Sequence, residues 1–144
     1  MGDRCQVEVT VRKDQVEQFI KIVGYDPDGE LENDLSVTLA FHETNYGMGM
    51  VLDVAACALI EFYGEHTAGD SYGAADFFSD GKGNIHYIPT GDEGYGIIVS
   101  GATPSQRLER LHELEERISA RNDHIERMRN PLYDLTRQSD VHTS

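Results

Sequence analysis

Residues 103–129 have the composition of one long, unbroken α-helix, and a helix of this length limits what the rest of a 144-residue chain can form. Thr103 is a favourable N-cap residue, and Pro104 suits the first helical position, where its missing N–H would have no partner. No glycine or proline follows until Asn130-Pro131, which ends the helix. The predicted helix has roughly 26 residues and a length of about 39 Å. The other elements must then form one small domain beside it.

The apolar residues of this helix repeat at heptad positions, except that Arg121 occupies one d position. Glutamate and arginine fill the other faces, as in a solvated coiled coil. A helix of this kind either lies on a sheet or pairs with its copy in a second subunit. Because it is long for so small a domain, we expect it to protrude or to form a homodimer. The predicted oligomerisation residues are Leu108, Leu111, Leu114, Ile118, Ile125 and Met128.

The N-terminal part of the chain predicts a strand, a helix and a second strand. Residues 5–11 alternate apolar and polar side chains, as do residues 35–41, which is the pattern of a strand with one buried face. Between them, Asp14 begins a helical apolar pattern with Glu17 in capping-box position, and Gly24 ends it. Residues 25–34 contain proline, glycine and five acidic residues, which indicates a loop.

Residues 48–60 fit either a helix or a buried strand, because short apolar runs do not distinguish the two. The alanines favour the helix, and a strand is expected to follow from Glu61. Residues 64–83 are rich in glycine and indicate a long loop with a short strand near 75–78. Turn signals at 80–83 and 90–94 then predict two further strands, at 84–88 and 95–100.

Together these patterns predict an α+β fold: strand–helix–strand–helix, then an antiparallel β-meander and the long C-terminal helix. We expect an acidic α+β domain over residues 1–102, the helix over 103–130 and a flexible tail over 131–144. A chain of this length can bury a real core, because about two thirds of the unfolded surface disappears on folding.

The negative charge of the chain is concentrated in its middle. Residues 26–100 carry fourteen acidic side chains and one basic side chain, Lys82, in a chain of formal net charge −14. The segments on either side are nearly neutral. Such a field repels nucleic acid and anionic membranes and attracts a basic partner. An acidic surface that serves only solubility is the alternative; the separation of charge along the chain is what a docking surface together with an oligomerising helix would produce.

Rows of carboxylates on strands and loops approach the charge density of duplex DNA, about one charge per 1.7 Å of axis. They can therefore occupy a basic groove built for nucleic acid. On this basis we expect a non-catalytic binding protein, an inhibitor whose partner is a basic protein or a nucleoprotein complex. The predicted partner-binding residues are Asp26, Asp28, Glu30, Glu32, Asp34, Asp70, Asp76, Asp80, Asp92 and Glu93.

The sequence contains no catalytic motif, which favours a binding protein without a cofactor over an enzyme. The alternative is a metal-assisted enzyme or a small-ligand-binding protein, because divalent cations accept mixed imidazole and carboxylate ligands. No spaced motif such as HExxH supports a metal site. The candidate ligands are His42, His66, Asp70 and His86.

Glu61 is the best single candidate for a carboxylate with a raised pKa, because Ile60 and Phe62 flank it. In a strand, however, a residue points to the face opposite that of its two neighbours. Alternation therefore places Glu61 on the solvent side.

The remaining composition is typical of a protein of a reducing compartment. Two cysteines, Cys5 and Cys57, are too few for a disulfide framework. The first residues lack the apolar segment of a signal peptide, and the longest apolar run, 54–60, is far shorter than the ~20 residues of a membrane span. We expect a cytoplasmic protein that does not contact membranes.

In size, acidity and lack of catalytic motifs, the sequence is similar to small phage-encoded inhibitors of host defence, the anti-CRISPR type included. The similarity covers composition and charge layout. It implies stoichiometric inhibition, in the cytoplasm of the host cell, by binding to a complex that handles nucleic acid. It implies no particular architecture, because the members of that class share no common fold.

Overall fold

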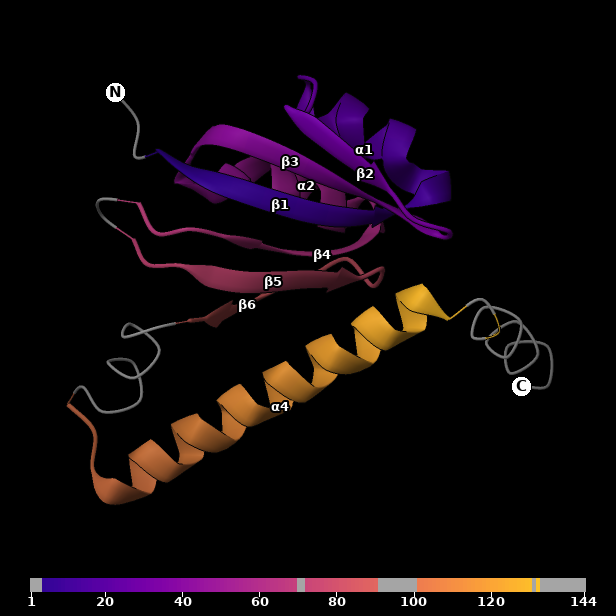
Figure 1. Cartoon of the computed structure of the whole chain (residues 1–144). Helices are drawn as coiled ribbons and strands as arrows, with labels where there is room; N and C mark the ends of the chain where they lie inside the picture. Colours follow the sequence, from indigo (N-terminus) through magenta and orange to yellow (C-terminus); the bar gives the residue numbers. More distant parts are fainter. Residues whose placement is uncertain (1–3, 70–71, 91–100, 131, 133–144) are drawn as a thin grey trace.

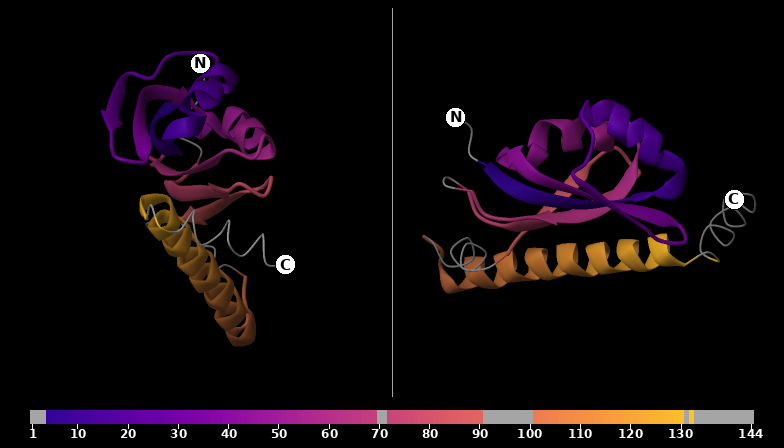
Figure 2. Two further views of the ribbon diagram at one scale, coloured as in Figure 1. Left: turned by 90° about the vertical axis from the view of Figure 1, so that its right-hand side faces the viewer. Right: turned by 45° about the horizontal axis from the view of Figure 1, so that its top comes forward.

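The computed structural model describes residues 4–69, 72–90, 101–130 and 132 of the chain. In this part of the chain, six strands form one antiparallel sheet in the order β2-β3-β1-β4-β5-β6 (Figure 1). Helices α1 and α2 pack on one face of the sheet, and α4 crosses the other face, as the two views of Figure 2 show. The architecture is therefore α+β, as the sequence predicts. The elements are β1 (Arg4–Arg12), η1 (Lys13–Gln15), α1 (Val16–Val23), β2 (Gly29–Glu32), β3 (Ser36–Asn45), η2 (Tyr46–Met48), α2 (Gly49–Cys57), β4 (Glu61–His66), β5 (Ala75–Asp80), β6 (Ile85–Pro89) and α4 (Pro104–Arg129).

β1 lies inside the sheet and divides its side chains between the two faces. Val9 and Val11 are fully buried on the face of α1 and α2, whereas Glu8 is exposed on the face of α4. The register sets Val9 opposite Leu39 of β3 and opposite Gly64 of β4. The period-two alternation of β1 therefore continues across the neighbouring strands and gives the sheet one apolar and one mixed face.

The main core lies between the apolar face of the sheet and the two short helices. Phe62 of β4 connects the layers: its ring centre lies 5.7 Å from that of Phe19 in α1 and 6.1 Å from that of Phe77 in β5. The buried members of this core are Cys5, Val7, Val9, Val11, Phe19, Val23, Val37, Leu39, Phe41, Met48, Leu52, Ala55, Ala56, Ile60, Phe62 and Phe77.

Gly64 allows the strands to approach closely in the middle of this core. A Cβ atom at this position would collide with the carbonyl oxygen of Glu8 and would lie 2.8 Å from the ring of Phe77. The Phe77 ring thus occupies the space that a side chain would need. Any larger residue at this position would force β1 and β4 apart.

α4 covers a smaller core on the opposite face, and only its C-terminal half does so. His124 packs there near Phe78 of β5, with 5.8 Å between the ring centres, and both residues are buried, as is Met128 one turn later in the helix. In the N-terminal half of the helix, Leu108 and Leu111 are exposed by 70% and 40%. The long helix is therefore both packed on the sheet and protruding. A coiled coil between two copies stays a prediction.

Most of the predicted elements are present. The structure confirms the strands over 5–11 and 35–41, the helix over 48–60, and the hairpin at 80–83 between β5 and β6. Thr103 begins α4 as predicted and forms a capping box with Gln106. The predicted strand over 95–100 lies outside the described residues.

Three local predictions are wrong. Residues 29–32 form strand β2, which pairs with β3, where a loop was expected. The strand was not predicted because its alternating residues are acidic and not apolar. β4 extends to His66, so the loop after it is shorter than predicted. The capping box expected from Asp14 and Glu17 is absent: η1 replaces the first turn, and α1 begins after Gln15 without a side-chain cap.

α2 ends in a Schellman motif that contains a strained leucine. The N–H of Ile60 donates to the carbonyl oxygen of Ala55 (3.2 Å), and that of Leu59 donates to Ala56 (3.0 Å). The motif requires a left-handed residue at Leu59, whose φ is 65°. Glycine usually fills this position, because left-handed backbone costs any other residue about 1–2 kcal/mol.

We expect Leu59→Gly to raise the free energy of unfolding by about 1 kcal/mol, because glycine adopts the left-handed conformation without strain. The leucine side chain is 55% exposed, so little packing is lost. Urea unfolding measures the change. Leu59→Ala is the control: it shortens the side chain but keeps the strain, and an equal gain with alanine would contradict the explanation.

Candidate functional site

β2 is the outer strand at one end of the sheet, and its carboxylates face solvent. Acidic residues occupy every second position from 26 to 34, so the side chains of Glu30 and Glu32 emerge on the same side of the strand. The register with β3 places both on the face that carries α1. We define the acidic edge as the exposed carboxylates of this strand, its flanking turns, η1 and the adjacent start of α1. They are Asp14, Glu17, Asp26, Asp28, Glu30, Glu32 and Asp34.

A recess of about 620 Å³ lies between β2 and the start of α1. Lys13 Nζ lies 3.1 Å from Glu32 Oε1, and Arg12 Nε lies 3.3 Å from Asp14 Oδ1. The carboxylate of each pair is largely exposed to solvent, so each pair contributes little to stability. Carboxylates outnumber amines in the recess, which makes it negative. The charged groups in its lining are Lys13, Asp14, Glu17, Glu30 and Glu32.

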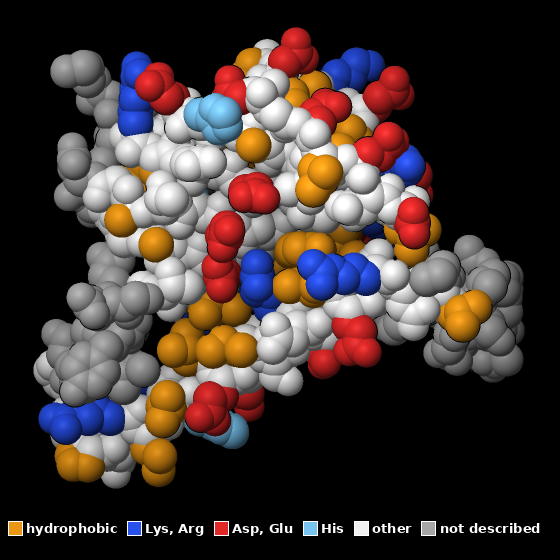
Figure 3. Space-filling model, viewed as in Figure 1, with side chains coloured by type: hydrophobic (Ala, Val, Ile, Leu, Met, Phe, Trp, Pro, Cys, Tyr) orange, Lys and Arg blue, Asp and Glu red, His pale blue; other side chains and the backbone are white. Residues whose placement is uncertain are grey.

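A row of carboxylates crosses the opposite face of the sheet. Glu65 of β4 is set directly opposite Glu8 of β1 and directly opposite Asp76 of β5. Figure 3 shows acidic side chains in a line across the strands, with basic side chains of α4 beside them. Arg121 Nη1 lies 3.9 Å from Asp76 Oδ2. Like charges directly opposite one another destabilise a sheet by about 0.2–1 kcal/mol, so this row lowers the stability of the fold.

A groove of about 620 Å³ lies between α4 and the part of the sheet that α4 leaves open. Tyr63 lines it, and the Cζ atoms of Arg121 and Arg129 each lie 5.9 Å from the centre of the Tyr63 ring. Arg121 also donates hydrogen bonds to the carbonyl oxygens of Gly64 (3.0 Å) and Phe77 (3.4 Å). Its guanidinium is thus engaged by the sheet. With Glu8 and Glu65 also in the lining, the groove has mixed charge and does not form an anion site.

Glu61 is buried in an ion network that joins β1, β4 and α4. Arg12 Nη1 donates to Glu61 Oε2 (2.9 Å), and Arg127 Nη2 donates to Glu61 Oε1 (2.7 Å). The strand alternation does place Glu61 opposite its apolar neighbours. The expectation that it faces solvent is wrong, because α4 covers this part of the sheet and leaves Glu61 only 7% exposed. Each oxygen of the carboxylate accepts a hydrogen bond from a guanidinium group, which suits a structural role.

His124 of α4 completes this network as a neutral, buried ring. Arg127 Nη2 lies 2.8 Å from Nδ1, which must accept the hydrogen bond because a guanidinium only donates. The proton is therefore on Nε2, which has no hydrogen-bonding partner among the described residues. Burial, reinforced by the charge of Arg127, lowers the pKa of His124 to about 4; Glu61, Asp80 and the Phe62 backbone act in the opposite direction.

The predicted metal ligands are not brought together. His66 lies on the face of α1 and α2, where its ring packs near Tyr72, Phe77 and Tyr87. His86 lies on the other face and stacks on Phe78. His42 belongs to β3, four strands away from β6, a separation of roughly 19 Å. Asp70 lies outside the described residues, among which no group of three acidic, histidine or cysteine side chains could hold a metal ion.

The predicted partner-binding residues fall into separate groups. The five from 26 to 34 belong to the acidic edge, where Asp28 Oδ2 also accepts a hydrogen bond from the N–H of His42 (2.7 Å). Asp76 belongs to the carboxylate row. Asp80 Oδ1 accepts from the N–H of Lys82 (3.1 Å) in the turn after β5. Asp92 and Glu93 lie outside the described residues.

The predicted oligomerisation residues divide between two environments. Met128 is buried against the sheet and Ile125 lines the groove, so both are used within the chain. Leu108, Leu111 and Ile118 remain exposed, by 70%, 40% and 42%. Leu114, between them, is half-buried. Leu108 and Leu111 lie in the protruding N-terminal half of α4, and Ile118 lies just past the midpoint of the helix.

Four acidic residues of these surfaces were missed by the sequence analysis. Glu8 and Glu65 were not chosen, although each occupies a polar position of an alternating strand. Asp14 and Glu17 were treated as capping residues of a helix. The spacing of the acids from 26 to 34 was itself a signal: a carboxylate at every second residue is the period of a strand with one charged face.

No family model matches the sequence, and no curated protein or solved structure shows significant similarity to the chain. In the described part of the chain, no helix combines the length and the apolar composition needed to cross a membrane.

We expect the lowered pKa of His124 to make stability depend on pH. The unfolded chain binds this proton near the ordinary pKa of 6.5, whereas the folded chain binds it only near 4. Unfolding is therefore favoured as the pH falls below 6.5, and the free energy of unfolding should drop by roughly 1.5 kcal/mol between pH 7.5 and 5.5 through this group. Above pH 6.5 the effect disappears.

Comparing urea unfolding of the natural protein with that of His124→Asn isolates this contribution. Asparagine offers Arg127 an acceptor oxygen but does not titrate. The carboxylates titrate in both proteins, so their contribution cancels in the comparison. An equal loss of stability between the two pH values in both proteins would contradict the assignment.

Proposed function

We propose that this chain is a non-catalytic binding protein that docks its acidic edge on a basic protein which handles nucleic acid, and inhibits it. The supporting observation is that all seven carboxylates of the acidic edge are exposed. Arg12 and Lys13 form the only ion pairs with this edge among the described residues. The surplus of negative charge attracts a basic surface and accelerates its association.

The carboxylates of the edge are spaced more widely than the phosphates of DNA, but they can still face the basic groups of a site that binds nucleic acid. Glu30 and Glu32 are two residues apart on one face of a strand, which separates them by roughly 6.8 Å. One strand of duplex DNA carries a charge about every 3.4 Å. The edge therefore has about half of that linear density, and β2, the turns and α1 together supply the field. Like the phage-encoded inhibitors that the sequence resembles, the protein would act stoichiometrically in the cytoplasm.

The acidic edge is a better docking surface than the carboxylate row. The row lies beside Arg121 and the other basic residues of α4, which partly neutralise its field. The edge lies on the outer strand of the sheet, and its Glu30 and Glu32 are directed to the face of α1, opposite the face that α4 crosses (Figure 1). Direct binding to nucleic acid or to an anionic membrane is not part of the proposal, because the same field repels phosphate.

The first test neutralises Asp26, Glu30 and Asp34, which form no ion pair among the described contacts. Asp26→Asn, Glu30→Gln and Asp34→Asn together should weaken binding about tenfold, since partly exposed interface charges contribute several tenths of a kcal/mol each. The partner is captured from lysate at 50 mM salt and identified, and its affinity is then measured with purified protein. Binding should fall sharply at 500 mM salt.

The matched control changes the charge by the same amount on α4. Glu109→Gln, Glu113→Gln and Glu115→Gln alter three exposed residues far from β2 and should leave binding nearly unchanged. The captured partner should lose its own nucleic-acid binding when the natural protein is added. Failure to capture any basic protein, indifference to salt, or an equal effect of the α4 control would contradict the proposal.

A second candidate function is assembly through α4, supported by the exposed side chains of Leu108 and Leu111 in its N-terminal half and of Ile118 just past its midpoint. We expect Leu108→Glu with Leu111→Glu to convert a dimer into a monomer, as measured by light scattering, because charge at a helix interface is strongly unfavourable. Ser105→Glu with Ser119→Glu adds the same charge at exposed polar positions and is the control. A natural protein that is already monomeric would exclude this function.

A further inference from the structure

β2 has one edge that no strand of the described residues covers. Its other edge pairs with β3 in an antiparallel ladder. The N–H of Asn33 donates to the carbonyl oxygen of Ser36 (2.8 Å), which fixes the phase of the hydrogen bonds in this hairpin. In such a ladder, alternate residues direct their N–H and C=O to the partner strand. The backbone N–H and C=O groups of Leu31 and Asn33 therefore point toward β3. Those of Glu30 and Glu32 point away from the sheet.

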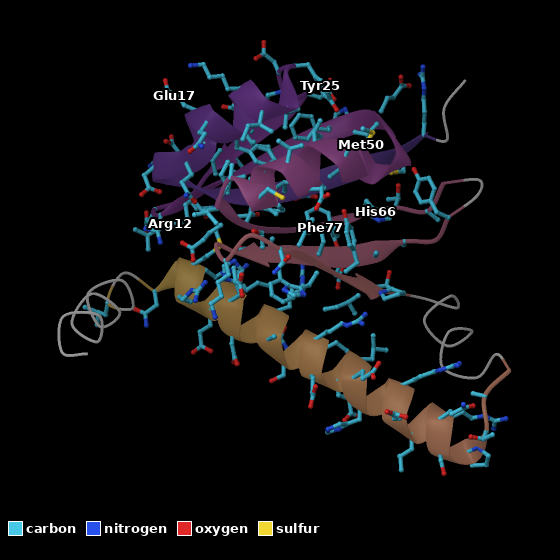
Figure 4. The ribbon with its side chains drawn as sticks, turned by 180° about the vertical axis from the view of Figure 1, so that it is seen from behind. Arg12, Glu17, Tyr25, Met50, His66 and Phe77 are labelled. Carbon is cyan, nitrogen blue, oxygen red and sulfur yellow. The ribbon has the colours of Figure 1, made fainter. Side chains whose placement is uncertain are left out.

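The two faces of β2 differ beside its open edge. The side chains of the two β2 glutamates emerge on the face of α1 and border the negative recess that Asp14 and Glu17 also line. Figure 4 shows Glu17 on the α1 side of the molecule. On the opposite side of β2, Leu31 is 65% exposed. A strand placed against this edge would have a carboxylate-lined recess above it and an apolar side chain below it.

These surroundings define the chemistry of the occupant. Successive side chains of an extended segment point to opposite faces, so every second residue would enter the recess and the others would lie beside Leu31. The recess suits lysine or arginine, and Leu31 suits an apolar residue. A second copy of the β2 edge does not fit, because it would place Glu30 and Glu32 against the same residues of the other copy. Charge on an edge strand commonly prevents such self-association.

We propose that β2 accepts one further strand from the partner, an extended segment in which lysine or arginine alternates with apolar residues. The backbone groups of Glu30 and Glu32 bind its main chain, and the recess binds its basic side chains. Strand addition of this kind takes affinity from main-chain hydrogen bonds and selectivity from the alternate side chains. This inference rests on the proposed function and specifies how the acidic edge would recognise its partner.

The test uses the full chain and a synthetic peptide of four lysine–valine repeats with blocked ends. Binding is measured by calorimetry, and the amide protons of Glu30 and Glu32 are followed by NMR hydrogen exchange. We expect saturable binding, with slower exchange at these two amides. Absence of binding, or binding without protection of these amides, would overturn the inference.

Two further peptides separate strand addition from simple charge attraction. One is N-methylated on every lysine and the other on every valine, so each has one edge blocked while the charge is unchanged. Because an added strand uses a single edge, one of these peptides should lose at least tenfold in affinity and the other should still bind. Equal binding by both would overturn strand addition, yet it would leave the proposed acidic docking intact.

Variants of the protein complete the experiment. Glu30→Gln with Glu32→Gln should weaken peptide binding about tenfold. Glu8→Gln with Glu65→Gln makes the same change of charge on the carboxylate row and should have little effect. An equal effect of both pairs would show that only net charge matters, and would overturn the inference. Failure of the proposed function itself would appear separately, as the absence of a basic protein captured from lysate.

Discussion

The arrangement of the molecule depends on one buried carboxylate. Glu61 lies between Arg12 of β1 and Arg127 of α4, so a single side chain joins the centre of the sheet to the long helix. Removing either arginine from such a network leaves a charge uncompensated in a buried place, which typically costs about 3–5 kcal/mol. The same network includes His124, whose pKa is lowered by burial and by the charge of Arg127, and whose ring lies beside Phe78. It therefore fixes where the helix crosses the sheet, and the position of α4 decides which surfaces remain open.

With α4 held at β4, β5 and β6, the other half of the sheet is uncovered on that face. The exposed surfaces that result differ in kind. The carboxylate row of Glu8, Glu65 and Asp76 is partly compensated by Arg121, whereas the acidic edge has few counter-charges. The protruding half of α4 is apolar along one side. The molecule thus keeps its most negative surface on the outer strand and on the face of α1, whereas the near-neutral helix crosses the opposite face.

The sequence predicts the strands whose apolar residues alternate regularly, and the helix whose two ends are marked by a cap and a proline. β1 and β3 were found from period-two alternation, and α4 from its cap and its freedom from glycine and proline. β2 was missed because its alternation consists of carboxylates, and the usual signal is apolar. The burial of Glu61 depends on α4, a segment more than forty residues later, which local pattern does not reveal. For the same reason spacing alone did not show that His66 lies on the opposite side of the sheet from His86.

The connection between Glu61 and Arg127 also affects the order in which this protein is completed. Every strand of the described sheet precedes α4 in the chain, so during synthesis the sheet leaves the ribosome before the helix does. Until then Glu61 remains in water, with Arg12 as its neighbour in β1. The last turns of α4 then bring the second guanidinium, that of Arg127, to the carboxylate, which is 7% exposed in the folded protein. The contact between Glu61 and Arg127 can therefore form only after the rest of the described sheet has been synthesised.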